Sequence, residues 1–145
     1  AKDPRIGSKM FNARAETVAE KPAFKSSFRR KRCLVPATGF YEWKQEGRGK
    51  VPYLFTVGDH DIFSFAGLYD TWRTPNGEVL YTYTLITTAP NELVAEVHDR
   101  MPVVLPRDKE EIWIDPGMED PSFLQSLLAP YPANLMQMHK VEGRL

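Results

Sequence analysis

The sequence contains one cysteine, Cys33, among 145 residues, and it has no hydrophobic run long enough to cross a membrane. A lone cysteine excludes an intramolecular disulfide and any metal site built from several thiolates, and it fits a reducing compartment. A transmembrane helix needs about 20 apolar residues, and no segment approaches that length. The first residues, AKDPR, also lack the apolar centre of a secretory signal. We therefore expect no membrane partner.

Motifs for metals and nucleotide cofactors are also missing. The three histidines and 19 acidic residues show no spacing typical of metal ligands. A glycine-rich phosphate loop and a dinucleotide-binding fingerprint are absent as well. We expect no metal and no cofactor.

Length and composition fit one folded domain, because 42% hydrophobic and 12% aromatic residues are too many for a disordered chain. Runs of β-forming residues dominate, and we expect an α+β fold in which short helices surround a β-rich barrel or sandwich. The expected strands cover residues 32–36, 40–43, 51–57, 62–69, 79–88, 101–105 and 135–141, with a turn at 74–77. The expected helices cover residues 15–20, 91–97, 108–112 and 121–128, with Asn91 and Asp108 as N-caps.

The net charge of zero hides an asymmetry along the chain. Residues 1–33 contain ten Lys or Arg and three acids, whereas residues 34–145 contain nine basic and sixteen acidic residues. A polyanion responds to the local field, so the neutral total leaves a nucleic-acid partner open. The alternative is a solvated basic face that pairs with the acidic remainder.

Two clusters near the start of the chain carry groups that bind anions. In NARAET (residues 12–17), Asn12, Arg14 and Glu16 share a face if the segment is extended, and the amide and guanidinium would hold a phosphate or carbonyl oxygen. In FRRKRC (residues 28–33), four cations beside aromatic rings are typical of a nucleic-acid groove. The alternatives are a polar surface turn and a solvated or targeting run. Cys33 is either a thiolate activated by its basic neighbours or a small buried residue.

Two further clusters contain groups that transfer protons. Glu42 lies among aromatics in GFYEW (residues 39–43), and an apolar setting would raise its pKa, as in a general acid. His98 in HDRMP (residues 98–102) titrates near neutral pH beside Asp99 and Arg100. The alternatives are an outward-facing strand glutamate and a structural network. Taken singly, the clusters at Asn12, Glu42 and His98 each favour the structural alternative.

Taken together and in order, five motifs resemble the SOS-response-associated peptidase (SRAP) family, whose members shield abasic sites in single-stranded DNA. The motifs are NARAET (12–17), RCLVPA (32–37), GFYEW (39–43), FAGLY (65–69) and HDRMP (98–102), within a match over residues 1–105. The resemblance implies a distorted β-rich barrel with peripheral short helices, a positively charged DNA channel, and a cytoplasmic, nucleoid-associated location.

The same resemblance implies a chemistry. Family members use a cysteine exposed at the N-terminus by self-processing, and its amine and thiol close a thiazolidine on the ring-opened abasic sugar. The resemblance therefore implies a protein that crosslinks covalently to DNA and has thiol peptidase (hydrolase) and lyase activity. This chemistry needs no metal or cofactor. The resemblance implies Asn12, Glu42 and His98 as catalytic groups and Arg14 and Arg100 as residues that bind phosphates. From the basic cluster we also expect Arg29, Arg30 and Arg32 to bind DNA, on a surface that runs from them past Arg14 and Arg100.

The chain departs from the family at its beginning, because it starts at Ala1 and has no cysteine at or near its N-terminus. We expect residues 1–145 to form a single SRAP-like domain that lacks its N-terminal segment and is inactive in covalent chemistry by itself. A sheet edge exposed in this way would allow homodimerisation. Two other functions stay open: a non-covalent single-stranded DNA-binding module, and a thiol protease that uses Cys33 and His98.

Overall fold

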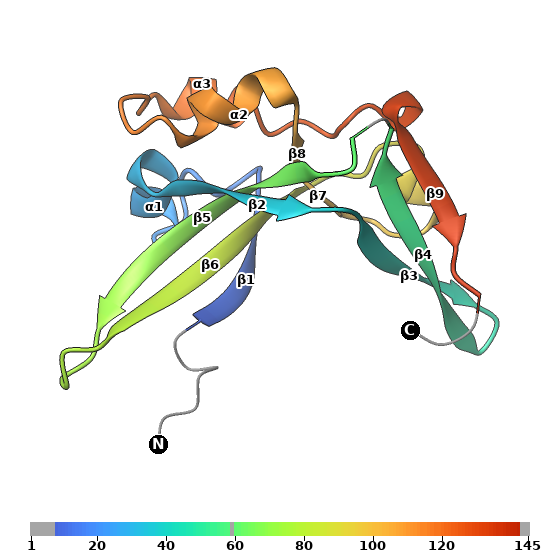
Figure 1. Cartoon of the computed structure of the whole chain (residues 1–145), viewed down its shortest axis with the longest axis horizontal. Coiled ribbons are helices and arrows are strands. Elements are labelled where there is room, and N and C mark those ends of the chain that lie inside the picture. Colours follow the sequence, from blue (N-terminus) through green and yellow to red (C-terminus); the bar gives the residue numbers. More distant parts are fainter. Residues whose placement is uncertain (1–7, 59, 143–145) are drawn as a thin grey trace.

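The computed structural model describes residues 8–58 and 60–142, with side chains from Phe11 onward, and it contains two β-sheets that curl into a half-barrel (Figure 1). The three α-helices gather over one side of the larger sheet, and the smaller sheet stands at its other end. The predicted α+β fold, a β-rich distorted barrel with short peripheral helices, is confirmed. Within the described ranges, no helix is long and apolar enough to cross a membrane.

The larger sheet has six strands, and its main path runs β1-β6-β5-β2. Strand β1 is parallel to β6, whereas β5 is antiparallel to both β2 and β6; β7 and β8 add to β6 and β5. The strands are β1 (Ser8–Arg14), β2 (Arg32–Ala37), β5 (Phe63–Arg73), β6 (Val79–Thr88), β7 (Met101–Pro102) and β8 (Val104–Leu105).

The smaller sheet is antiparallel in the order β3-β4-β9. Its strands are β3 (Phe40–Glu46), β4 (Gly49–Val57) and β9 (Met136–Lys140). The helical elements are α1 (Lys25–Arg30), α2 (Arg107–Ile114), α3 (Pro121–Ser126) and the 3₁₀ turns η2 (Val94–Glu96) and η3 (Ala133–Leu135).

Two hydrophobic cores lie on opposite faces of the larger sheet. Alternation along β5 divides them, because Ala66 and Leu68 join one cluster and Phe63 and Phe65 join the other. The first cluster also contains Phe28, Trp113 and Leu124 from the three helices, and we call this side the helix face. The second cluster contains Phe40, Phe55 and Met136 of the smaller sheet, and we call this side the open face, because the smaller sheet covers only one end of it.

Each segment that we expect to be a strand contains one. Residues 101–105 form two strands rather than one, because β7 pairs with β6 and β8 pairs with β5. The turn at residues 74–77 ends at Gly77, whose φ of 83° is a left-handed conformation that favours glycine. Strand β1 and helix α1 are not among the predicted elements, because each lies in a segment whose polar side chains mask its buried positions.

Of the four predicted helices, those at residues 108–112 and 121–128 fall on α2 and α3, and residues 91–97 contain only the 3₁₀ turn η2. The N-cap of η2 is Leu93 and not the predicted Asn91, although the Asn91 side chain accepts the Val94 N–H at 2.9 Å just before it. The predicted cap at Asp108 is wrong: α2 begins at Arg107 with Pro106 at its N-cap and no side-chain capping bond. Asp120 instead caps α3. Residues 15–20 form turns rather than a regular helix.

Candidate functional site

Glu42 and His98 meet at the junction of the two sheets. Alternation along β3 turns Glu42 to the same side as the buried Phe40, while Tyr41 and Trp43 point outward. Glu42 Oε2 lies 3.6 Å from His98 Nε2. Burial raises the pKa of the Glu42 carboxyl, and the neighbouring His98 opposes that shift. The pair therefore combines a half-buried acid with an imidazole, the composition of a proton-transfer site.

The other nitrogen of His98 faces the backbone of Arg100, and Asp99 Oδ1 lies 3.5 Å from it. His98 Nδ1 lies 3.2 Å from the Arg100 amide nitrogen and 3.1 Å from the Arg100 carbonyl oxygen. The amide donates to the ring when Nδ1 lacks a proton, and the carbonyl accepts from it when Nδ1 carries one. The loop thus keeps Nε2 directed at Glu42 in both protonation states.

Arg100 fastens this loop to the end of strand β1. Its Nη1 donates to Glu16 Oε2 at 2.6 Å, and its Nη2 donates to Glu16 Oε1 at 3.0 Å and to the Thr87 carbonyl at 2.9 Å. The hydrogen bond from Arg100 is the main cause that lowers the pKa of Glu16 to about 2. Thr87 belongs to β6, so three segments meet at one guanidinium. The sequence motifs contain Arg100 and Glu16 but give no signal for Thr87.

Asn12 and Arg14 lie on β1 and point to the open face. Both are exposed, while Ala13 between them is buried on the helix face. In the parallel register Asn12 pairs with Leu85 and Arg14 with Thr87, the residue that Arg100 contacts. The predicted shared face of Asn12, Arg14 and Glu16 therefore fits the alternation of exposed and buried positions. The structure brings Glu42 into contact with His98, and it places Arg14 beside the Arg100 anchor.

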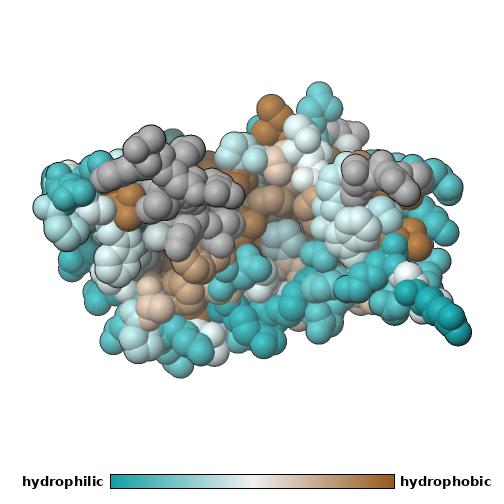
Figure 2. Space-filling view, turned by 90° about the horizontal axis from the view of Figure 1, so that it is seen from below, coloured by the Kyte–Doolittle hydropathy of each residue, from teal (hydrophilic) through white to brown (hydrophobic). Residues whose placement is uncertain are grey.

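Figure 2 shows the molecule from below the arch that the two sheets form in Figure 1. Hydrophobic surface gathers in the middle of this view, and hydrophilic residues line its lower margin. A surface of this kind suits a ligand with both apolar and charged parts.

Arg29 and Arg30 lie on the helix face, on the opposite side of the larger sheet from Asn12 and Arg14. They are exposed in the last turn of α1, which packs on the helix face, and both approach Glu119 Oε1, at 4.0 and 3.3 Å. Lys31 pairs with Asp70 at 2.9 Å. The expected single surface from the basic cluster past Arg14 and Arg100 is therefore corrected: the sheet separates the two groups, because α1 and the side chains of Asn12 and Arg14 occupy opposite faces.

Arg32 is part of the interior. Only 6% of it is exposed, and its guanidinium makes five hydrogen bonds of 2.5–2.9 Å to backbone carbonyl oxygens. It also lies over the Trp113 ring, 5.6 Å from the centroid. The acceptors are the carbonyls of Phe28, Arg29, Trp113, Asp115 and Met118. Every N–H of Arg32 is used inside the fold, so we withdraw it from the residues expected to bind DNA.

Cys33 has the character of a structural cysteine. Burial raises the pKa of its thiol, which favours the unreactive protonated form. This environment argues against the thiol-protease hypothesis. No group of three or more His, Cys, Asp and Glu side chains in the described part of the chain is arranged to hold a metal ion.

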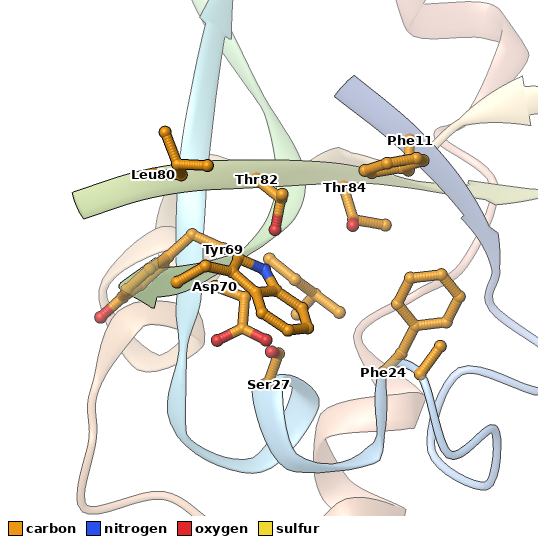
Figure 3. A pocket seen from close by; sticks show the side chains of 11 residues that line it. Phe11, Phe24, Ser27, Tyr69, Asp70, Leu80, Thr82 and Thr84 are labelled. Atoms are coloured by element: carbon orange, nitrogen blue, oxygen red, sulfur yellow. The ribbon is translucent and has the colours of Figure 1, made fainter. Parts of the chain in front are cut away.

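A cavity of about 400 Å³ lies on the helix face (Figure 3). Phe11 and Phe24 border it on one side, and Leu80, Thr82 and Thr84 of β6 border it on another. Its other lining residues are Ala23, Ser27, Leu68, Tyr69, Asp70 and Trp72. It contains none of the predicted site residues.

Comparison with curated proteins gives relatives of stated function. The abasic site processing protein YoqW of Bacillus subtilis is 51% identical over 144 residues, which cover 99% of this chain and 64% of YoqW. The abasic site processing protein HMCES of Xenopus tropicalis is 38% identical over 136 residues, which cover 79% of this chain and 41% of HMCES. The chain thus spans less than two thirds of the length of these relatives.

Solved structures and a family model agree with these matches. A crystal structure of a Bacteroides thetaiotaomicron protein has a TM-score of 0.86 at 40% identity, covering 90% of this chain and 58% of that one. A Bordetella bronchiseptica protein has a TM-score of 0.80 at 29% identity, covering 90% and 64%. The model of the SOS response associated peptidase (SRAP) family matches residues 1–145, and the chain belongs to this family.

Proposed function

We propose that this chain supplies the DNA-binding face and the proton-transfer pair of an abasic site processing protein. The proposal rests chiefly on the Glu42–His98 contact at 3.6 Å, at the edge of the open face. Family membership and the names of the relatives support the same function. Abasic DNA exposes an aldehyde after ring opening, and its reactions need proton donors and acceptors near neutral pH.

The finer chemistry that we propose is a covalent crosslink to single-stranded DNA. The α-amine of an N-terminal cysteine, supplied by a longer form of the protein after self-processing, attacks the aldehyde and releases water as an imine forms. The thiol then adds across the C=N bond, its sulfur binding carbon and its proton passing to nitrogen, which closes a thiazolidine. Peptidase and lyase activities belong to the same proposal.

In this scheme the residues of this chain have separate roles. Glu42 delivers a proton during ring opening and loss of water, and its raised pKa keeps the acid form available. His98 exchanges the proton with Glu42 and acts again when the crosslink reverses. Asn12 holds the reacting group by its amide, and Arg14 binds a phosphate.

Arg100 acts here as a positioning residue as well as a cation. Its bidentate contact with Glu16 and its bond to Thr87 occupy both terminal nitrogens. A phosphate contact from Arg100 would compete with Glu16. We therefore propose that its main contribution is to fix the loop that carries His98.

A denaturing-gel assay with abasic single-stranded DNA tests the covalent part. It compares this chain with a version extended at its N-terminus to expose a cysteine, and intact single-stranded DNA is the control. A heat-stable shifted band that needs both the extension and the abasic site supports the proposal. Absence of that band from the extended version contradicts crosslinking.

Non-covalent binding of single-stranded DNA is the second candidate for the chain as it stands. The raised pKa and partial burial of Cys33 favour it, because they leave this chain's own thiol poorly suited to attack. Affinity that falls steeply with salt, without a heat-stable band, would identify this behaviour. A cytoplasmic, nucleoid-associated location is part of both candidates.

Homodimerisation is a further element of the proposal. Strand β1 terminates the main path of the larger sheet, and an open edge strand can pair with another chain. Light scattering at high protein concentration tests this. A monodisperse monomer would contradict dimerisation.

A further inference from the structure

Two tyrosines extend the open face beyond the groups discussed so far. Tyr81 and Tyr83 lie on β6, and their rings are nearly parallel, with centroids 6.5 Å apart and an interplanar angle of 17°. Tyr81 is 44% exposed, although a tyrosine ring is largely apolar. Neither ring belongs to either hydrophobic core.

Alternation along β6 puts these rings on the same face as Asn12. Leu80, Thr82 and Thr84 line the cavity on the helix face, so the odd-numbered residues between them point to the other side. Leu85, which packs against the open-face core, continues the odd-numbered row and pairs in register with Asn12. The tyrosine pair therefore adjoins Asn12 on one continuous surface.

Arginines stand at both ends of this row. Arg14 pairs in register with Thr87, and the exposed Arg73 pairs with Val79. The row from Tyr81 to Thr87 measures roughly 20 Å at the rise of an extended strand. Aromatic rings between cations match the alternating bases and phosphates of a single nucleic-acid strand.

We propose that Tyr81 and Tyr83 form a stacking platform for bases that flank the abasic site in single-stranded DNA. This inference rests on the proposed function and adds a binding subsite to it. An abasic nucleotide has no base to stack, so its own position offers little apolar contact. Stacking on the neighbouring bases would supply affinity and hold the lesion against Asn12. Any base can stack, so the platform tolerates different flanking sequences.

The test is the affinity of the full chain for fluorescently labelled abasic single-stranded DNA, measured by anisotropy at low salt. Tyr81→Ala and Tyr83→Ala should each weaken binding about fivefold or more, whereas Tyr81→Phe should retain most of it because the ring remains. Trp72→Ala is the matched control, since Trp72 is 59% exposed on the neighbouring strand but borders the helix-face cavity.

A second set of oligonucleotides identifies the stacked base. In each of them, one base next to the lesion is replaced by a baseless spacer. If Tyr81 stacks on that base, Tyr81→Ala should have almost no further effect on the oligonucleotide that lacks it. Unchanged affinity of both alanine variants, or an equal loss with every oligonucleotide, would overturn the platform. If the unaltered chain does not bind abasic DNA, the proposed function fails, and this inference fails with it.

Discussion

On the helix face of the larger sheet, Arg32 is 6% exposed and gives all its N–H groups to backbone carbonyls, whereas on the open face Arg14 is exposed on an edge strand. Both positions are arginines in polar motifs of the same N-terminal third. What separates them is the position of each guanidinium relative to the sheet. An arginine whose donors are used inside the fold contributes to stability, and one that faces solvent beside acid–base groups can bind an anion.

Arg100 lies between these two extremes. Its side chain is 18% exposed, and it is bound to Glu16 and Thr87, yet it sits next to His98. The comparison of the two faces therefore predicts that an Arg32 variant loses stability, whereas an Arg14 variant loses affinity for DNA.

The largest expected effect is on the helix face. Arg32→Ala removes the guanidinium donor from five carbonyl oxygens, of which Asp115 O keeps the Met118 N–H, and it should lower the free energy of unfolding by about 3–5 kcal/mol. Arg32→Lys should recover only part of this, because an ammonium cannot reproduce the planar set of donors. Urea denaturation followed by circular dichroism measures both. A stable Arg32→Ala variant with weakened DNA binding would reverse our assignment of the two faces.

A comparably large effect is expected for Glu42 on the crosslinking rate of an N-terminally extended form. Glu42→Gln removes the proton donor and should slow crosslinking about a hundredfold, with DNA affinity unchanged. Because the acid form of Glu42 donates the proton, the crosslinking rate of the protein with Glu42 should fall as pH rises through the raised pKa of Glu42. This pH dependence should be absent from the Glu42→Gln variant. Glu46→Gln, on the same face of β3, is the control. An unchanged rate would exclude Glu42 as the acid.

A moderate effect should distinguish Arg14 from Arg29. Arg14→Ala should weaken binding to abasic single-stranded DNA about tenfold at low salt. It should also reduce the slope of log affinity against log salt by about 0.7, the value for one phosphate on a single strand. Arg29→Ala removes the same charge from the helix face, beside Glu119, and should change affinity little. Equal losses in gel-shift titrations would contradict the separation of the two basic groups.

The smallest expected effect concerns Glu16. Half of its side chain is exposed, so solvent screening limits the loss in Glu16→Gln to less than about 1 kcal/mol at neutral pH. Its pKa falls from 4.5 to about 2 on folding, so the ion pair stabilises the protein above about pH 4.5 and that contribution disappears toward pH 2. The stability difference between the two proteins should therefore shrink as pH falls over this range. A constant difference would contradict the ion pair.

Local patterns in the sequence predict much of the fold, because strands such as β4, β5 and β6 have apolar and β-branched residues that bury only in an extended chain. Strand β1 is harder to predict. Its alternation is short, and its partner β6 lies about 70 residues away, so the parallel pairing depends on tertiary structure. Helix α1 is hidden for another reason: its cations suggest a solvated run, although Phe28 is fully buried.

Local sequence patterns also predict the candidate site only in part. The motifs containing Asn12, Glu42 and His98 are visible in the sequence, but the distance between Glu42 and His98 depends on how β3 and the loop before β7 pack together. The structural role of Arg32 is the feature that the sequence predicts least well, because a run of four cations does not indicate which of them is buried. Only the packing of α1 against α2 and residues 115–118 reveals it.

Amide chemical-shift mapping of the 145-residue chain with abasic single-stranded DNA tests the central claim most directly. If the open face binds DNA, the largest shifts will occur in β1, in β6 from Tyr81 to Thr87, and in the loop of His98 and Arg100. Amides of α1 and α3 will move little. Largest shifts around Arg29, Arg30 and Glu119 would place the DNA on the helix face and contradict the account.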